Sequence, residues 1–331
     1  MASGGDLGRV RIGSTGVEVT RLVLGCAPIG GLYEAVSAED AAAALEQAWR
    51  LGVRSFDTAP HYGAGLAERR LGAFLATVPV GQATVSTKVG RLLRPAGPDG
   101  APAPPEFAGE DRVHRVRDYS AAGVRRSLEE SLERLGLDRV DVALVHDPED
   151  HLDEALAGAL PELARLRAAG VVGAIGAGMN LCAPLERIVA EADVDCVLVA
   201  GRYSLLDQGA AARLLPLCEA RRVSVLVGGV FNSGVLADVR PGARFDYRPA
   251  SDEVLERARA IALVCERHGV PLKAAAIRFP LRHPAVSAVV VGARSAAEVA
   301  EDVDCFQSEV PEALYDELAA RRLVRSEVGS R

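Results

Sequence analysis

Eight short apolar runs that alternate with segments of helical spacing constrain the fold of this chain more than any other feature. The runs lie at residues 22–25, 53–57, 84–88, 140–146, 171–176, 196–201, 223–228 and 288–292. Segments whose apolar residues recur with the helical period cover residues 38–51, 65–77, 123–135, 153–169, 182–191, 208–220, 253–268 and 296–305. Continuous apolar strands that alternate with helices are typical of a parallel sheet. Eight such repeats predict an α/β fold in which the sheet closes into a (β/α)8 TIM barrel.

Further segments lie outside the eight repeats. Residues 9–22 have the pattern of a two-stranded hairpin, which we expect to cap one mouth of the barrel. Residues 271–282 and 311–322 are predicted to be extra C-terminal helices. The Pro- and Gly-rich residues 91–119 are predicted to be an active-site lid, because long insertions in compact domains are commonly functional. We interpret residues 1–331 as a single domain.

Charge and composition disfavour several classes of protein. The formal net charge is -7 and no block of Lys or Arg exceeds two residues, so we expect no nucleic-acid partner. We find no apolar leader and no uninterrupted apolar stretch of about 18 residues, so we expect no membrane association and a cytoplasmic location. The six cysteines are widely spaced without a C-x-x-C motif, which predicts buried, reduced thiols. We expect a monomer or a small homo-oligomer.

Three of the apolar runs end in an ionisable residue. Asp57 ends the second run, Lys88 the third and His146 the fourth, and Tyr62 follows on the loop after Asp57. A barrel gathers the C-terminal ends of its strands around one mouth, where barrel enzymes keep their catalytic groups. We therefore predict that these four side chains converge on one catalytic site.

The segments "DTAPHYGAGLAERRLG", "STKVG" and "VHD", in this order and spacing, resemble the aldo-keto reductase superfamily. The resemblance extends over nearly the whole chain, including "RSLEESLERLGLDRVD" and "VVGARSAAEVAED". It implies a (β/α)8 barrel, a nicotinamide cofactor and a catalytic tetrad of Asp57, Tyr62, Lys88 and His146.

Physical chemistry supports these roles independently. Hydride transfer between an alcohol or carbonyl and nicotinamide requires a proton to leave or reach the substrate oxygen, and Tyr62 can exchange it. A free phenol has a pKa near 10, and the Lys88 ammonium is expected to lower the pKa of Tyr62. Asp57 would keep Lys88 charged and oriented. His146 would hydrogen-bond the substrate oxygen and fix its angle.

The cofactor residues are implied by the resemblance, because no G-x-G-x-x-G motif follows the first strand. The family binds nicotinamide cofactors extended across the barrel mouth. The corresponding residues here are Gly25, Cys26, Ala27, Asp57, Met179, Asn180, Val230, Phe231, Asn232, Ser233, Gly234, Leu236, Gly292, Arg294, Glu298 and Asp302. The chain departs from the family pattern at three points. Ala200 stands where a glutamine is common, Gly228 or Gly229 stands where a stacking tyrosine is expected, and Phe231 is a candidate substitute for that tyrosine.

The choice between NAD and NADP depends on Glu298 and Arg294. Relatives that bind NADP place a basic residue where Glu298 lies, and a carboxylate there would repel the 2′-phosphate and accept hydrogen bonds from ribose hydroxyls. This favours NAD. NADP remains the alternative, because Arg294 is close enough in sequence to pair with a 2′-phosphate.

The substrate prediction rests on the loop "VHDPEDH", whose carboxylates suit the hydroxyls of a polyol. The predicted substrate residues are His61, Tyr62, His146, Asp147 and Tyr203. We expect no metal, because contiguous ligands on one short loop seldom reach one ion. With "AGRYSLLD" and "FDYRPAS", the loop resembles the aldose 1-dehydrogenase branch (L-fucose, D-threo-aldose and L-galactose dehydrogenases) and related pyridoxal 4-dehydrogenases.

These patterns predict an enzyme that oxidises a small-molecule aldose at C1 to the lactone with NAD, and Tyr62 as general base. Two enzymatic alternatives stay open: an NADPH-dependent reductase of aldehydes or ketones, and a pyridoxal 4-dehydrogenase. An alternative of another class is a regulatory subunit that binds nucleotide without rapid turnover.

Overall fold

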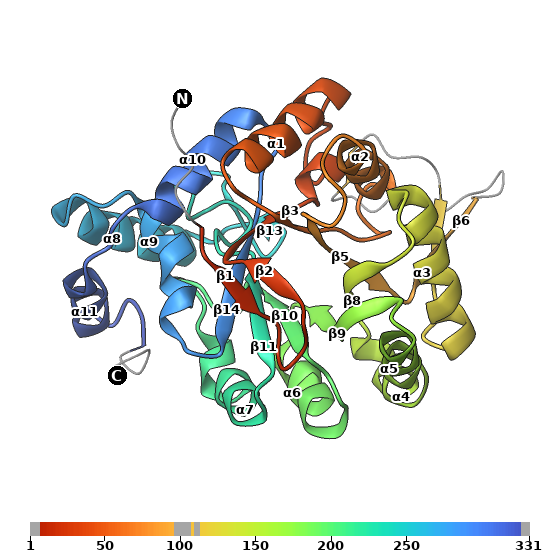
Figure 1. Cartoon of the computed structure of the whole chain (residues 1–331). Coiled ribbons are helices and arrows are strands. Elements are labelled where there is room, and N and C mark those ends of the chain that lie inside the picture. The colour runs from red at the N-terminus through yellow and green to blue at the C-terminus, as the bar shows by residue number, and fades with distance from the viewer. Residues whose placement is uncertain (1–6, 96–106, 109–112, 326–331) are drawn as a thin grey trace.

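The computed structural model describes residues 7–95, 107–108 and 113–325, and its central feature is a closed barrel of parallel strands (Figure 1). Around the barrel the strands follow one another in chain order. They are β3 (Leu22–Gly25), β4 (Ser55–Asp57), β5 (Thr84–Val89), β8 (Val140–His146), β9 (Val172–Met179), β10 (Cys196–Ala200), β11 (Ser224–Gly228) and β14 (Val286–Gly292). Each predicted apolar run overlaps one of these strands, so the barrel prediction is confirmed.

Helices surround the strands in Figure 1. The main ones are α1 (Ala38–Arg50), α2 (Leu66–Leu75), α3 (Ala121–Leu135), α5 (Leu160–Ala168), α6 (Cys182–Glu191), α7 (Leu214–Arg221), α8 (Asp252–Arg267) and α10 (Ala296–Gln307). The two extra helices are α9 (Leu272–Arg278) and α11 (Glu312–Ala320). Serine side chains cap the N-termini of α1, α3, α8 and α10 by accepting a backbone N–H.

Two predicted helices are less regular than expected. The segment before α5 is a short helix, α4 (Leu152–Glu154), followed by a π-helical turn at Ala155–Ala159. The segment before α7 is a 3-10 turn at Gly209–Ala212. Apolar periodicity locates such segments but does not separate the α-helix from its tighter and wider variants.

The hairpin of β1 (Arg9–Arg11) and β2 (Glu18–Thr20) closes the mouth at the N-terminal ends of the strands. The Thr20 N–H donates to Ser55 Oγ at the start of β4 (2.8 Å), and the Thr84 hydroxyl at the start of β5 donates to the Glu18 carbonyl (2.8 Å). Ile12, in the hairpin turn, is fully buried in the barrel interior. The opposite mouth, where the predicted catalytic residues lie, therefore remains available for a site.

The predicted lid, residues 91–119, is partly a second hairpin. Its ends form the antiparallel strands β6 (Arg91–Pro95) and β7 (Val113–Arg117), which the sequence analysis did not predict. Residues 96–106 and 109–112 lie outside the described part of the chain. Phe107 forms a β-bridge with Leu32 and is nearly fully buried. The lid itself stays a prediction.

Within the described residues, no helix has the length and hydropathy that crossing a bilayer requires.

The loop that carries Tyr62 depends on a close approach of two backbones. Gly63 has a left-handed φ of 58°, and a Cβ at this position would collide with the Gly30 carbonyl oxygen. Gly30 in turn packs on the backbone of Tyr62. The glycine at position 63 thus brings the loop after β3 against the loop after β4.

We predict that Gly63→Ala destabilises the protein by more than the roughly 1–2 kcal/mol that a left-handed φ costs an L-residue, because the collision adds to that cost. Turnover should also fall, since Tyr62 is displaced. The matched control is Gly81→Ala, where φ is 79° but nothing lies within 4 Å of the added Cβ. Denaturant unfolding of both variants measures the difference, and equal losses of stability would show that the contact with Gly30 is unimportant.

Candidate active site

The predicted catalytic residues converge around the buried ammonium of Lys88. Its Nζ donates to Asp57 Oδ2 (2.7 Å), to the Thr58 carbonyl (3.0 Å) and to the Tyr62 hydroxyl (3.0 Å). These contacts use all three N–H donors of the ammonium. Ser86 donates to the other Asp57 oxygen (2.9 Å), so the carboxylate is held from two sides. Strand register explains the meeting, because Asp57 lies beside Ser86 in the ladder and Lys88 points into the barrel two residues later.

His146, at the end of β8, completes the cluster. Its ring centroid lies 6.0 Å from that of Tyr62 and 5.7 Å from that of His61, both in edge-on orientation. The side chain is buried, and within the described residues its Nδ1 has no hydrogen-bond partner. An unpaired, buried imidazole nitrogen beside a phenol is suited to engage a substrate oxygen.

The ionisation of Lys88 and Tyr62 follows from burial and their mutual contact. Burial disfavours the ammonium, but Asp57 and Tyr62 raise the pKa of Lys88 above its ordinary value. Burial raises the pKa of Tyr62 to about 12, although Lys88 lowers it. The sequence predicts a phenol more acidic than usual, but in this structure the effect of desolvation on the pKa of Tyr62 outweighs that of the ammonium.

Burial and nearby cations favour the neutral form of both histidines at the site by lowering their pKa values. Burial, with Arg91 and other cations nearby, lowers the pKa of His61 to about 2. The pKa of His146 also lies well below its usual value, for the same reasons. A neutral His146 can donate or accept one hydrogen bond without adding a charge to the pocket.

The backbone after His146 is held in an unusual conformation. Asp147 has a φ of 43°, and the Tyr119 hydroxyl lies 2.8 Å from the carbonyl oxygens of both His146 and Asp147. Arg91 donates to Asp147 Oδ2, which lies 3.5 Å from His146 Nε2. The carboxylate of Asp147 is therefore fixed beside the imidazole. Arg91 is a functional candidate that the sequence analysis missed.

A cavity of about 650 Å³ extends from Asp57 and Tyr62 across the C-terminal mouth. Most of the predicted cofactor residues line it: Gly25, Ala27, Asp57, Asn180, Val230, Phe231, Ser233, Gly234, Gly292, Arg294, Glu298 and Asp302. Ala200, Gly228 and Gly229 line it as well, so the positions that depart from the family pattern form part of its wall.

Four predicted cofactor residues do not line this cavity, because their side chains are buried behind its wall: Cys26, Met179, Asn232 and Leu236. Asn232 contacts two residues of the loop after β10 through hydrogen bonds. Its amide donates to the Gly201 carbonyl (3.2 Å) and its Oδ1 accepts from the Ser204 hydroxyl (2.5 Å).

The predicted substrate residues divide into two groups. Tyr62 lines the cavity. His61 and His146 pack near the Tyr62 ring and Asp147 lies beside His146, but these three do not line the cavity themselves. Tyr203 is placed elsewhere: its fully buried ring packs on Phe279 with centroids 5.4 Å apart. The geometry therefore does not support a substrate contact by Tyr203.

Aromatic residues that the sequence analysis missed contribute to the cavity wall. Tyr33 and Tyr247 lie on opposite loops with ring centroids 6.3 Å apart, and the Arg244 guanidinium lies 4.9 Å from the Tyr33 ring centroid. The sequence carries no local signal for this meeting, because these residues come from segments more than 200 positions apart.

Paired charges occupy the end of the cavity formed by α10. Arg294 contacts Glu34 (2.9 Å) and Glu298 (3.1 Å). Lys273 contacts Glu301 (2.7 Å) and Asp302 (2.9 Å). Burial raises the pKa of Asp302 to about 6 despite Lys273. Both cations at this end are thus already paired with carboxylates.

Comparison with known proteins assigns the chain to a family. The model of the aldo/keto reductase family matches residues 21–321. The chain belongs to the aldo/keto reductase family. A D-threo-aldose 1-dehydrogenase from a Pseudomonas species is 46% identical over 317 residues, which cover 94% of this chain and 96% of the relative. A pyridoxal 4-dehydrogenase of Microbacterium luteolum is 41% identical over 332 residues, which cover 95% and 97%.

Solved structures show the same fold. The glycerol dehydrogenase AKR11B4 of Gluconobacter oxydans matches with a TM-score of 0.72 at 23% identity, over 100% of both chains. As an aldo/keto reductase, the protein is an oxidoreductase that uses a nicotinamide cofactor and acts on a small-molecule substrate.

The residues present fit such a cofactor. One cavity of about 650 Å³ is lined both by Asp57 and Tyr62 and by residues of α10, so a single extended ligand could contact both ends of the site. Glycines on its wall permit close backbone approach. The His146 ring lies edge-on to the Tyr62 ring, and within the described residues its Nδ1 has no hydrogen-bond partner, so this imidazole is suited to engage a substrate oxygen beside Tyr62.

Proposed function

We propose that this protein is an NAD-dependent aldose 1-dehydrogenase, which oxidises a cyclic aldose at C1 to the lactone. The observation that carries the proposal is the buried hydrogen bond between Lys88 and Tyr62 at the end of a cavity suited to a dinucleotide. The two relatives described above act as dehydrogenases by name, and one of them on an aldose.

Each residue of the tetrad has a role in this reaction. Tyr62 removes the proton from the C1 hydroxyl, and Lys88 stabilises the phenolate that does so. Asp57 holds Lys88 charged, and His146 hydrogen-bonds the C1 oxygen to fix its angle. The bound nicotinamide supplies the acceptor for the hydride that leaves C1. Loss of the proton and the hydride leaves the C1 carbonyl of the lactone.

The paired charges near α10 support NAD as the cofactor. A 2′-phosphate would have to displace Glu34 or Glu298 from Arg294, and would meet the repulsion of both carboxylates. The Glu298 carboxylate can instead accept hydrogen bonds from the ribose hydroxyls of NAD.

The Asp147 carboxylate supports a polyol substrate. Arg91 donates to this carboxylate, and the Tyr119 hydroxyl holds the backbone carbonyl of Asp147. Together these contacts fix the carboxylate beside His146, where it can accept a hydrogen bond from a sugar hydroxyl. Polar groups held in place in this way, even when partly exposed like Asp147, can discriminate between substrates that have the matching hydroxyl and those that lack it.

A second candidate is pyridoxal 4-dehydrogenase activity. Phe107 is stacked near Tyr62, with ring centroids 6.1 Å apart and planes 26° apart, and it also contacts His61 edge-on. Flat aromatic walls favour a flat substrate ring.

Tyr62→Phe tests the proton-transfer role. We expect kcat to fall on the order of 10² to 10⁴-fold, the usual contribution of a positioned acid or base. NAD affinity, measured by calorimetry, should be unchanged, because the ring remains. Wild-type turnover in this variant would refute the role.

Lys88→Met tests the coupling of the ammonium to the phenol. Oxidation requires the phenolate, so kcat/KM should increase with pH below the pKa of Tyr62. Without Lys88 nothing offsets the effect of burial, so the pKa of Tyr62 rises further. The pH profile of kcat/KM should therefore move to higher pH, and kcat/KM at neutral pH should fall. Lys88→Arg, which keeps a cation, should move the profile less. A profile that stays in place in Lys88→Met would exclude Lys88 from this role.

A substrate screen tests the proposed function itself. We expect reduction of NAD in preference to NADP with one or more of L-fucose, L-galactose and D-arabinose, compared with pyridoxal. Asp147→Asn should lower kcat/KM for the aldose by about tenfold or more, but should leave NADH-dependent reduction of a simple alkyl aldehyde nearly unchanged. A preference for NADPH would contradict the cofactor assignment. Absence of turnover with every combination of substrate and cofactor would favour a regulatory subunit.

A further inference from the structure

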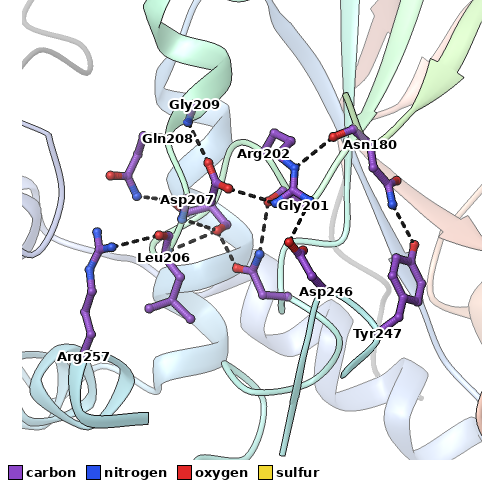
Figure 2. Close-up of polar contacts among 12 residues, drawn as sticks. Asn180, Gly201, Arg202, Leu206, Asp207, Gln208, Gly209, Asp246, Tyr247 and Arg257 are labelled. Carbon is purple, nitrogen blue, oxygen red and sulfur yellow. Dashed lines mark hydrogen bonds and ion pairs between the residues drawn. The ribbon is translucent and has the colours of Figure 1, made fainter. Parts of the chain in front are cut away.

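Arg202, just beyond β10, joins three loops at the edge of the cavity (Figure 2). Its Nε donates to the Asn180 carbonyl (2.9 Å), its Nη2 to Asp246 (2.8 Å) and its Nη1 to Asp207 (3.0 Å). The side chain is 21% exposed and does not itself line the cavity. Arg202 therefore acts on the cavity only through the residues that it holds.

Two of those loops carry residues that face the cavity. Asn180 follows β9, and Tyr247 lies in the turn between β12 (Arg244–Phe245) and β13 (Arg248–Pro249). The Asn180 amide lies 3.5 Å from the Tyr247 hydroxyl, as Figure 2 shows. Strand register places Asn180 near the catalytic end, because His146 pairs with Gly178, two residues before it.

The turn that presents Tyr247 needs support. Asp246 and Tyr247 both have left-handed φ values, 48° and 65°, which are unfavourable for residues with a Cβ. Arg202 contacts the Asp246 carboxylate, and the Ser233 hydroxyl accepts the Tyr247 N–H (3.0 Å). These contacts stabilise a conformation that the turn would otherwise disfavour.

The part of the wall at the ends of β10 and β11 offers few side chains for recognition. Ala200, Gly228 and Gly229 carry no polar group and no ring beyond the backbone. Asn180 brings an amide that can hydrogen-bond a carboxamide, and Tyr247 brings a ring that can stack on a flat heterocycle.

We propose that Arg202 is a positioning residue that holds Asn180 and Tyr247 together as a clip for the nicotinamide end of the cofactor. The inference rests on the proposed use of NAD. It differs from the tetrad's role, because the clip acts on cofactor binding and not on proton transfer.

The test compares two ligands, NAD and ADP-ribose, which lacks the nicotinamide. Binding of each is measured by calorimetry in the absence of substrate. Arg202→Ala should weaken NAD binding on the order of tenfold and leave ADP-ribose binding unchanged. Tyr247→Ala should give the same pattern, and the double variant should lose less than the sum of the two, since both changes open one clip.

Arg257→Ala is the matched control. Arg257 holds the same loop through the Leu206 carbonyl (3.0 Å), also drawn in Figure 2, but its other contact is the Leu323 carbonyl, remote from Asn180 and Tyr247. Its loss should leave NAD affinity unchanged. Arg202→Lys should restore part of the affinity lost in Arg202→Ala, because it keeps the charge beside Asp246.

Asp246→Asn provides a second route if Arg202→Ala unfolds. It removes one ion pair and should give a smaller loss that is again confined to NAD. Equal loss of NAD and ADP-ribose binding, or a loss no greater than in Arg257→Ala, would overturn the inference. Failure of the proposed function has a different signature, since it is read in the substrate screen of the wild-type protein, as a preference for NADPH or as absence of aldose turnover, and not in the difference between NAD and ADP-ribose binding.

Discussion

The site depends on one ammonium kept charged in a place that water does not reach. An unpaired charge in a protein interior costs several kcal/mol, so Lys88 is tolerated only because Asp57, Thr58 and Tyr62 accept all three of its hydrogens. Two of these acceptors belong to β4 and the turn after it, and the third to the following loop. A shift of either element would leave a buried donor unsatisfied, so the geometry of the barrel mouth and the ionisation of Lys88 stabilise each other.

This coupling explains how the fold supports the chemistry. The β1–β2 hairpin fills the opposite mouth with Ile12, and the strands then present their C-terminal ends as the open rim. Contacts between loops then fix the side-chain positions. The close approach of Gly63 to Gly30 positions Tyr62, and the hydrogen bond of the Tyr119 hydroxyl to the backbone carbonyl of Asp147 positions Asp147. The barrel supplies the positions of the catalytic groups, and these loop contacts supply their orientation.

The sequence predicted what repeats locally and missed what depends on distant contacts. The barrel strands were predictable because both of their faces are buried, which gives continuous apolar runs. Strands β6 and β7 are rich in arginine and lack such a run, so their pairing was hidden. Three strand ends and one loop were enough to predict the meeting of Asp57, Tyr62, Lys88 and His146. The Arg202 contact with Asp246 spans 44 positions without a local pattern, and the raised pKa of Tyr62 depends on burial that spacing does not reveal.

The two ends of the cavity differ in their electrostatics. One end has an ammonium that contacts a neutral phenol, and the other has cations that are already paired with carboxylates. At the catalytic end one ammonium faces a phenol, and any charge that develops on a substrate oxygen is stabilised by a group that already exists in the right place. Near α10, two cations face four carboxylates from Glu34, Glu298, Glu301 and Asp302. An added anion there gains little attraction and must first break existing pairs. This asymmetry agrees with the proposal that the reaction takes place at the Lys88 end and that the α10 end holds the adenosine part of NAD, whose ribose carries no 2′-phosphate.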